Sequence, residues 1–217
     1  MTYNWLEHWE QGDIPFHLDA ANPFLEKYWS KLKVTRKANV LVPLCGKSKD
    51  LLWLMNQGYH VIGIELSEIA CEAFFVENNL SFKKIKNSKF LCYHHDQIKL
   101  YCGDFFALSS DMIPTITAVY DRAALQALPK KLRQIYACHL AQLIVSNGQM
   151  LLITYDSPTD LEQGPPYSVS FQEVKGLFET KFQINELVRE QKIEISKPLW
   201  DKGYRELYKV AYNLKKI

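Results

Sequence analysis

Four short segments of this 217-residue chain place polar groups where an apolar run ends. They are Pro43 to Gly46, Glu65, Gly103 to Phe105, and the pair Asp121 and Arg122. A carboxylate such as Glu65 can accept two hydrogen bonds from a cis-diol, and a guanidinium such as Arg122 stays protonated and offers several donors. These groups could bind the sugar of a nucleoside and supply a charged contact beside it.

The position of Glu65 favours a role in ribose binding. It follows the first of these segments by about 20 residues, the spacing at which an acidic side chain reaches ribose hydroxyls in nucleotide-binding α/β folds. The alternative is a solvated acid at the end of a strand. For Arg122, the alternative to a functional role is a structural ion pair with Asp121 or another acid.

The first loop lacks the glycines that phosphate binding requires. Gly46, Lys47 and Ser48 resemble the end of a phosphate-binding loop, but that pattern needs glycine where this chain has Leu41. The dinucleotide pattern G-x-G-x-x-G is also missing, which speaks against a dehydrogenase. A ligand without phosphates fits better, and a sulfonium amino acid joined to a nucleoside meets that condition.

The elements that would position these segments alternate between strand and helix. Apolar runs predict strands at Val40 to Val42, Val61 to Leu66, Ile98 to Cys102, Ile116 to Tyr120 and Gln149 to Thr154. Amphipathic stretches between and after them predict helices at Asp50 to Asn56, after the N-cap Ser67, at Lys130 to Ser146 and at Phe171 to Phe178. In the third of these helices, an apolar stripe is formed by Leu132, Ile135, Tyr136, Leu140 and Leu143. Two further runs, Ile184 to Ile195 and Tyr204 to Tyr212, could pair as antiparallel neighbours. This order predicts an α/β fold with a parallel sheet covered on both faces, whose loops converge at the carboxyl ends of the strands.

Composition excludes several classes of protein. Twenty-six basic and 24 acidic residues give a net charge of +2, too small for the broad positive field that nucleic-acid binding uses. The five cysteines contain no C-x-x-C, which argues against a disulfide framework and a zinc site and favours a reducing cytoplasm. No export signal is visible, and the apolar runs are far shorter than the roughly 20 residues that span a bilayer.

A set of short segments runs in order along nearly the whole chain: Trp5 and Trp9 with Gly12 to His17, Asn22-Pro23, Val40 to Leu51, Gly63 to Glu68, Cys102 to Phe106, Tyr120 to Leu125, and Gly164 to Val169. In these segments the chain resembles the thiopurine S-methyltransferases, particularly their bacterial branch. The resemblance implies a class I methyltransferase (Rossmann-like) fold, with a mostly parallel seven-stranded sheet and a terminal antiparallel hairpin. It also implies one domain over residues 1–217, in which residues 1–36 cover the active site.

The resemblance also implies roles for particular residues. S-adenosylmethionine, which leaves as S-adenosylhomocysteine, would contact Trp9, Leu44, Glu65 and Arg122, with Gly103, Asp104 and Phe105 on its adenine side. Phe16 and Tyr167 would border the methyl acceptor, and Arg122 would be the catalytic charged contact. No metal is expected, and the histidine pair His94-His95 is read as solvated surface. His139 is read as a core histidine with a hydrogen-bond partner.

The implied activity is methyl transfer to the sulfur of thiopurines or related aromatic and heterocyclic thiols, by a monomer in the cytoplasm. Its partner would be this small-molecule substrate rather than nucleic acid or a membrane. One alternative is a methyltransferase of the same fold that acts on selenium or tellurium oxyanions or other small soft acceptors. A non-catalytic binding module built on a similar sheet is the other.

Overall fold

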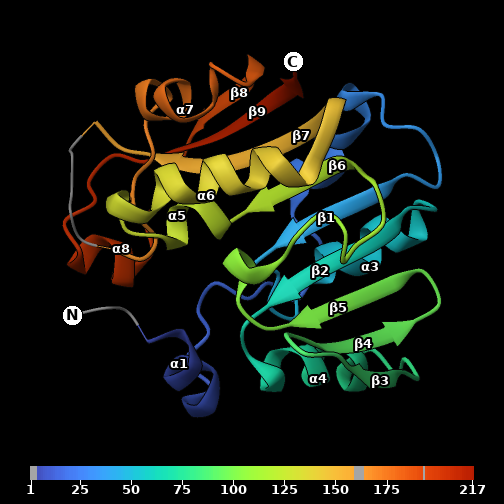
Figure 1. Ribbon diagram of the computed structural model, residues 1–217. Coiled ribbons are helices and arrows are strands. Elements are labelled where there is room, and N and C mark those ends of the chain that lie inside the picture. The colour runs from blue at the N-terminus through green and yellow to red at the C-terminus, as the bar shows by residue number, and fades with distance from the viewer. Residues whose placement is uncertain (1–3, 159–163, 193) are drawn as a thin grey trace.

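The computed structural model describes residues 4–158, 164–192 and 194–217. A nine-stranded sheet runs through this part of the chain in the order β3-β4-β5-β2-β1-β6-β7-β9-β8 (Figure 1). Its centre consists of strands that pair in parallel: β5 (Ile98–Cys102), β2 (His60–Glu65), β1 (Asn39–Pro43), β6 (Ile116–Arg122) and β7 (Ile144–Asp156). Because β2 lies on one side of β1 and β6 on the other, the strand order reverses at β1, where a ligand crevice is expected.

The C-terminal part of the sheet is antiparallel, as the sequence predicted. β9 (Tyr208–Lys216) pairs antiparallel with both β7 and β8 (Phe182–Gln191), so the last strand of the chain lies between its two predecessors. The observed strands are offset by a few residues from the predicted runs. The seven strands from β5 to β8 in the sheet order form the predicted sheet.

Two strands on the opposite edge were not predicted, so the expected count of seven was too low. β3 (Lys83–Lys86) and β4 (Leu91–His95) continue the sheet antiparallel to β5. Every residue of β3 is exposed, and three of its four residues are lysines. It therefore carries no apolar alternation by which a sequence pattern would reveal a strand.

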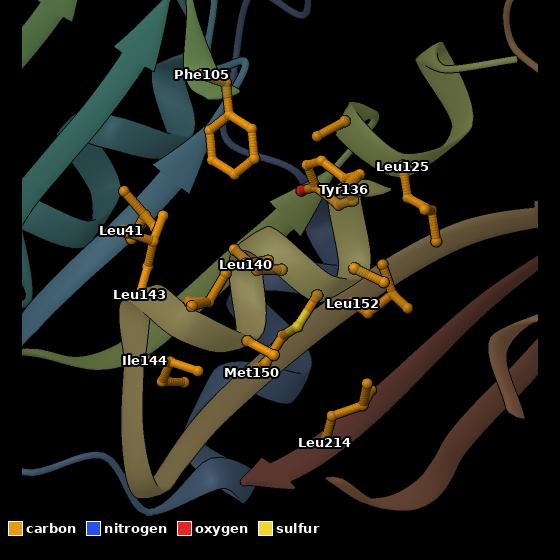
Figure 2. Close-up of a cluster of buried hydrophobic side chains, with 14 of the residues drawn as sticks. Leu41, Phe105, Leu125, Tyr136, Leu140, Leu143, Ile144, Met150, Leu152 and Leu214 are labelled. Carbon is orange, nitrogen blue, oxygen red and sulfur yellow. The ribbon is translucent and has the colours of Figure 1, made fainter. Parts of the chain in front are cut away.

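Helices cover both faces of the sheet and enclose two apolar clusters. One cluster packs Leu41 and Leu152 against α6 (Lys130–Leu143) and α7 (Phe171–Phe178); Figure 2 shows Tyr136, Leu140 and Leu143 of α6 in it. The other packs the neighbouring residues of β1, Val40 and Val42, against the opposite layer: α2 (Pro23–Tyr28), η1 (Trp29–Leu32), α3 (Lys49–Asn56) and α4 (Glu68–Glu77). Successive side chains of a strand point to opposite faces, which explains why both sides of β1 are apolar.

Helix boundaries agree with the sequence in part. Ser67 caps α4 by accepting a hydrogen bond from the Ala70 N–H at 3.2 Å, as predicted. However, α6 ends at Leu143 rather than continuing toward Ser146, because Ile144 already pairs with β6. Ile135, predicted on the buried stripe of that helix, is 55% exposed.

Short helices lie at the carboxyl edge of the parallel strands. The arrowheads of β1, β2 and β6 point toward the side that holds α1 (Trp5–Gln11), α5 (Ala124–Ala127) and α8 (Lys197–Asp201) (Figure 1). A single 3-10 turn, η2 (Phe105–Ala107), follows β5. No helix was predicted at α8, because its five residues are too few to show a helical period.

Candidate functional site

A cleft of about 680 Å³ opens at this edge of the sheet. Residues from all four segments singled out in the sequence line it, including Leu44, Glu65, Asp104 and Arg122. Its volume lies within the usual range for small-molecule sites, about 300 to 1,000 Å³. The predicted convergence of the four loops is therefore confirmed.

Glu65 ties the loops after β1, β2 and β5 together. Its buried carboxylate accepts hydrogen bonds from the backbone N–H groups of Gly46 and Ser67, each at 2.8 Å. Its backbone carbonyl accepts from the Gly103 N–H, also at 2.8 Å. Burial raises the pKa of Glu65, and the N–H donors of Ser67 and Gly46 oppose that rise. Since a carboxylate offers about four lone-pair sites, acceptor capacity remains for the hydroxyls of a ribose.

Two glycines allow close approaches around this carboxylate. A Cβ on Gly46, whose φ is +54°, would lie 3.1 Å from the indole of Trp9. A Cβ on Gly103 would lie only 2.6 Å from the Phe90 ring. Both loops can therefore pack so closely only without a side chain at these positions.

The predicted adenine side is held in place by His139. Its Nε2 forms a 3.0 Å hydrogen bond to the carbonyl oxygen of Phe105, and the two rings meet edge to face at 5.0 Å. His139 thus has the expected hydrogen-bond partner, but it is partly buried rather than a residue of the core. Asp104 caps η2 by accepting from the Phe106 N–H at 3.0 Å.

Arg122 lies in the cleft with 14% of its side chain exposed. One of its terminal nitrogens donates a 3.1 Å hydrogen bond to the Phe16 carbonyl, and its Nε lies 3.9 Å from Oδ2 of Asp50. Asp121, named in the sequence as a candidate ion-pair partner, points into the core instead and accepts from the Tyr136 hydroxyl at 2.7 Å. Burial raises the pKa of Asp121 to about 6. The acid beside Arg122 is therefore Asp50.

Sequence reasoning missed Asp50 and Lys209 as cleft residues. Asp50 is buried in the first turn of α3, where its carboxylate accepts from the Asn22 N–H at 2.6 Å and the Tyr120 hydroxyl at 2.9 Å. Lys209, at the start of β9, donates a 3.0 Å hydrogen bond to the Asn22 side chain. An acid in the first turn of a helix gives no functional signal, because it is the ordinary complement to the helix dipole.

Aromatic residues of the N-terminal segment cover one end of the cleft. The Phe16 ring lies edge to face with Trp5 and with Trp9, each pair at 5.5 Å, and all three side chains line the cleft. Trp9 is only 7% exposed. Such a group can exclude water and present ring faces to a cation.

Tyr167 is placed differently from the expected position. It is not among the described residues that line the cleft, whereas its neighbours Pro165 and Pro166 are. Its backbone N–H donates to the Gln126 carbonyl at 2.8 Å, and its ring lies 5.5 Å from the guanidinium of Arg133. In this segment the prolines face the cleft in its place.

The part of the chain that the structure describes offers no metal site. No group of three or more histidine, cysteine, aspartate or glutamate side chains is arranged there to hold a metal ion. His94 and His95 are partly buried on β4, where the Nδ1 of His95 hydrogen bonds to the Ser81 carbonyl. No helix in these ranges is both long enough and apolar enough to cross a bilayer.

Comparison with known proteins decides the family. The model of the thiopurine S-methyltransferase family matches residues 1–216. The chain belongs to the thiopurine S-methyltransferase family. A thiopurine S-methyltransferase of Nitrosospira multiformis is 45% identical over 185 residues, which cover 85% of this chain and 84% of that protein. One from Pseudomonas fluorescens is 39% identical over 213 residues, 98% of each chain.

Solved structures support the class I methyltransferase fold. The Burkholderia thailandensis 1,6-didemethyltoxoflavin N1-methyltransferase, solved with S-adenosylhomocysteine, superposes with a TM-score of 0.67 at 14% identity, over 98% of this chain and 85% of that chain. A methyltransferase of Anabaena variabilis gives a TM-score of 0.65 at 14% identity, over 98% and 93% of the two chains. As a family member, this chain is an S-adenosylmethionine-dependent methyltransferase.

The residues of the cleft fit that cofactor. Glu65 offers a buried anionic acceptor for ribose hydroxyls, and the absence of a phosphate-binding loop suits a donor without phosphates. Trp9 and Phe16 supply aromatic surface suited to a sulfonium.

Proposed function

We propose that this protein transfers the methyl group of S-adenosylmethionine to the sulfur of thiopurines or related aromatic and heterocyclic thiols, in the cleft at the carboxyl ends of β1, β2, β5 and β6. The observation that carries the proposal is the buried Glu65 carboxylate, which joins the loops after β1 and β2 and retains acceptor capacity toward the cleft. The family match supplies the reaction type.

The cofactor occupies the half of the cleft over β1, β2 and β5. Glu65 accepts hydrogen bonds from its ribose, and Leu44 packs beside the sugar. Gly103, Asp104 and Phe105 border the adenine, and Phe105 is kept in position by His139. Trp9 closes this half from the N-terminal side, through its contact at Gly46.

The acceptor occupies the half over β6, β7 and β9, near Phe16 and Arg122. Bound S-adenosylmethionine supplies an electrophilic methyl group on a positively charged sulfur. Arg122 holds the anionic sulfur of the acceptor in line with that methyl, because its guanidinium is always charged and retains donors beyond the one used by the Phe16 carbonyl. Phe16 and Trp9 keep water from the reacting atoms. An aromatic thiol is already partly ionised near neutral pH, so these residues need only position it.

The predicted cover comprises residues 1–36, of which 1–3 lie outside the described residues; residues 4–36 cover this site in a single methyltransferase domain, and the protein acts as a cytoplasmic monomer. Support for the cover comes from Trp9 and Phe16, which line the cleft, and from the hydrogen bond between Arg122 and the Phe16 carbonyl. Tyr167 contributes to the acceptor site only indirectly, since the residues of its segment that line the cleft are Pro165 and Pro166.

Two measurements test the proposal. Thermal unfolding is followed with S-adenosylmethionine, S-adenosylhomocysteine, NAD and ATP, and only the first two should raise the melting temperature. Chromatography then measures methylated product from a thiopurine, an arenethiol, selenite and tellurite. Methylation of the thiols is expected. Methylation of the oxyanions alone would show that the acceptors are oxyanions instead of thiols. Stabilisation by NAD or ATP alone would show that S-adenosylmethionine is not the cofactor.

A further inference from the structure

Lys209 is a cationic residue that lines the cleft from β9, a strand antiparallel to its neighbours. It lies at the start of β9, paired with Tyr155 of β7 and Glu190 of β8. Because β9 runs antiparallel to β7, its first residues stand at the same edge as the carboxyl ends of the parallel strands. The side chain lines the cleft in the half assigned to the acceptor.

The ammonium of Lys209 is held in place but not neutralised. Its Nζ donates to Oδ1 of Asn22 at 3.0 Å and lies 4.3 Å from the centre of the Phe24 ring. Among the described residues, no carboxylate forms an ion pair with it, and Asn22 is its one hydrogen-bond acceptor. An ammonium has three donors, so two remain available to a ligand.

Around Lys209, the charges of Arg122 and Lys192 offset those of Asp50 and Glu190, so the positive charge of Lys209 itself is left unbalanced. Burial, and next the charge of Arg122, lower the pKa of Lys209 to about 8. Of the described residues that line the whole cleft, three are acidic, Asp50, Glu65 and Asp104, and five are lysine or arginine: Lys47, Arg122, Lys192, Lys202 and Lys209. Asp50 already serves Asn22, Tyr120 and Arg122. A partly buried cation without a counter-charge is costly, and an anionic ligand would remove that cost.

We propose that Lys209 is a specificity-determining residue that pairs with an anionic group of the acceptor, so that the preferred acceptors carry a negative charge in addition to the reacting sulfur. The proposal rests on the proposed methyl transfer to a small thiol, in which Arg122 serves the sulfur. Lys209 has its own anchors, Asn22 and Phe24, and thus provides a second, separately fixed positive charge for another part of the same molecule.

The test compares two acceptors of equal size that differ in charge, 4-mercaptobenzoate and 4-mercaptobenzamide. The wild-type protein should have the lower KM for the benzoate. Lys209→Met should raise the KM for the benzoate about 10-fold, equivalent to about 1.4 kcal/mol, and change the KM for the benzamide and both kcat values by less than about 3-fold. Lys209→Arg should restore the preference. Lys215→Met, an exposed lysine of the same strand, is the matched control and should behave as wild type.

A second readout is the pH dependence of the preference. The charged groups that face Lys209 are Arg122 on β6, Asp50 on α3, and Glu190 and Lys192 at and beyond the end of β8. The preference for the benzoate should decline above about pH 8 in the wild type, where Lys209 loses its proton, and persist in Lys209→Arg. Both acceptors carry a thiol, so the ratio of their KM values cancels the pH dependence that comes from ionisation of the thiol.

Binding without chemistry separates this proposal from the proposed function. Calorimetry measures the affinity of 4-(methylthio)benzoate in the presence of S-adenosylhomocysteine. Weaker binding to Lys209→Met than to Lys215→Met supports the anion contact even if no thiol is methylated, which would reject only the proposed function. Equal loss for benzoate and benzamide would show that Lys209 merely holds Asn22, and a wild type without preference would overturn the proposal.

Discussion

Glu65→Gln is the change that most directly tests how the cofactor half of the cleft is built. The glutamine keeps the size of the side chain but replaces one oxygen with an NH2 group. In the native protein each carboxylate oxygen accepts from a backbone N–H, one from Gly46 and one from Ser67. In the variant, one of these two N–H groups must face another donor.

The expected magnitudes follow from those bonds. A buried N–H without an acceptor costs about 1 to 3 kcal/mol, and removing a buried charge, whose burial raises the pKa of Glu65, recovers part of that cost. The free energy of unfolding without ligand should therefore fall by about 1 kcal/mol. The ribose hydroxyls lose a charged acceptor, so binding weakens by about 1 to 3 kcal/mol, or about 5-fold to 150-fold in Kd.

Calorimetric titration with S-adenosylhomocysteine gives the Kd, and urea unfolding gives the stability. Glu72→Gln, on the exposed side of α4, removes the same charge away from the cleft and should leave Kd unchanged. A folded Glu65→Gln protein whose Kd stays within about 2-fold of wild type would refute the ribose assignment, since a 2-fold change is only about 0.4 kcal/mol and the smallest expected loss is about 1 kcal/mol. An equal loss of affinity in Glu72→Gln would show that the net charge of the protein, and not a contact with the ribose, controls binding.

Three further predictions concern the cleft and the core beneath it. Arg122→Ala should lower kcat/KM about 100-fold while the free energy of unfolding falls by only about 1 kcal/mol, the value of its hydrogen bond to the N-terminal segment; wild-type turnover in the folded variant would contradict this role. Gly103→Ala should lower the free energy of urea unfolding by about 1 to 3 kcal/mol, because its Cβ would lie 2.6 Å from the Phe90 ring. Gly176→Ala, where a Cβ meets nothing within 4 Å in the middle of α7, should instead raise stability by about 0.5 to 1 kcal/mol, and equal effects would refute the steric argument. Burial raises the pKa of Asp121 to about 6, so the folded state binds this proton more tightly than the unfolded state. The free energy of urea unfolding should therefore fall as the pH rises from about 4 to about 6. Asp121→Asn should make this pH dependence weaker. A steeper fall in the variant would contradict the assignment.

The parts of the site that the sequence predicted are those that local pattern and sheet geometry determine. Glu65 and Arg122 were found because each ends an apolar run, and the carboxyl ends of parallel strands share one edge. The cap at Ser67 was found because a hydroxyl before a helical stretch satisfies a free N–H group. The aromatic cover at Trp9 and Phe16 was inferred only from resemblance to the family.

The parts that the sequence missed depend on long-range placement. Lys209 is the second residue of an antiparallel strand, whereas ligand sites of α/β sheets are expected at the carboxyl ends of parallel strands. Asp50 owes its importance to Asn22 and Tyr120, residues 28 and 70 positions away. β3 depends on its pairing with β4 for its strand conformation, because its own residues are all exposed and lack an apolar pattern.

The position of β9 between β7 and β8 also bears on how the molecule assembles. β8 precedes β9 in the chain but joins the sheet only through it, so the edge strand can reach the sheet only together with β9 or after it. Contacts of this kind close long loops and slow folding. We therefore expect the acceptor half of the cleft, which includes Lys209, to gain protection from hydrogen exchange during refolding after the β1, β2 and β5 core is already protected.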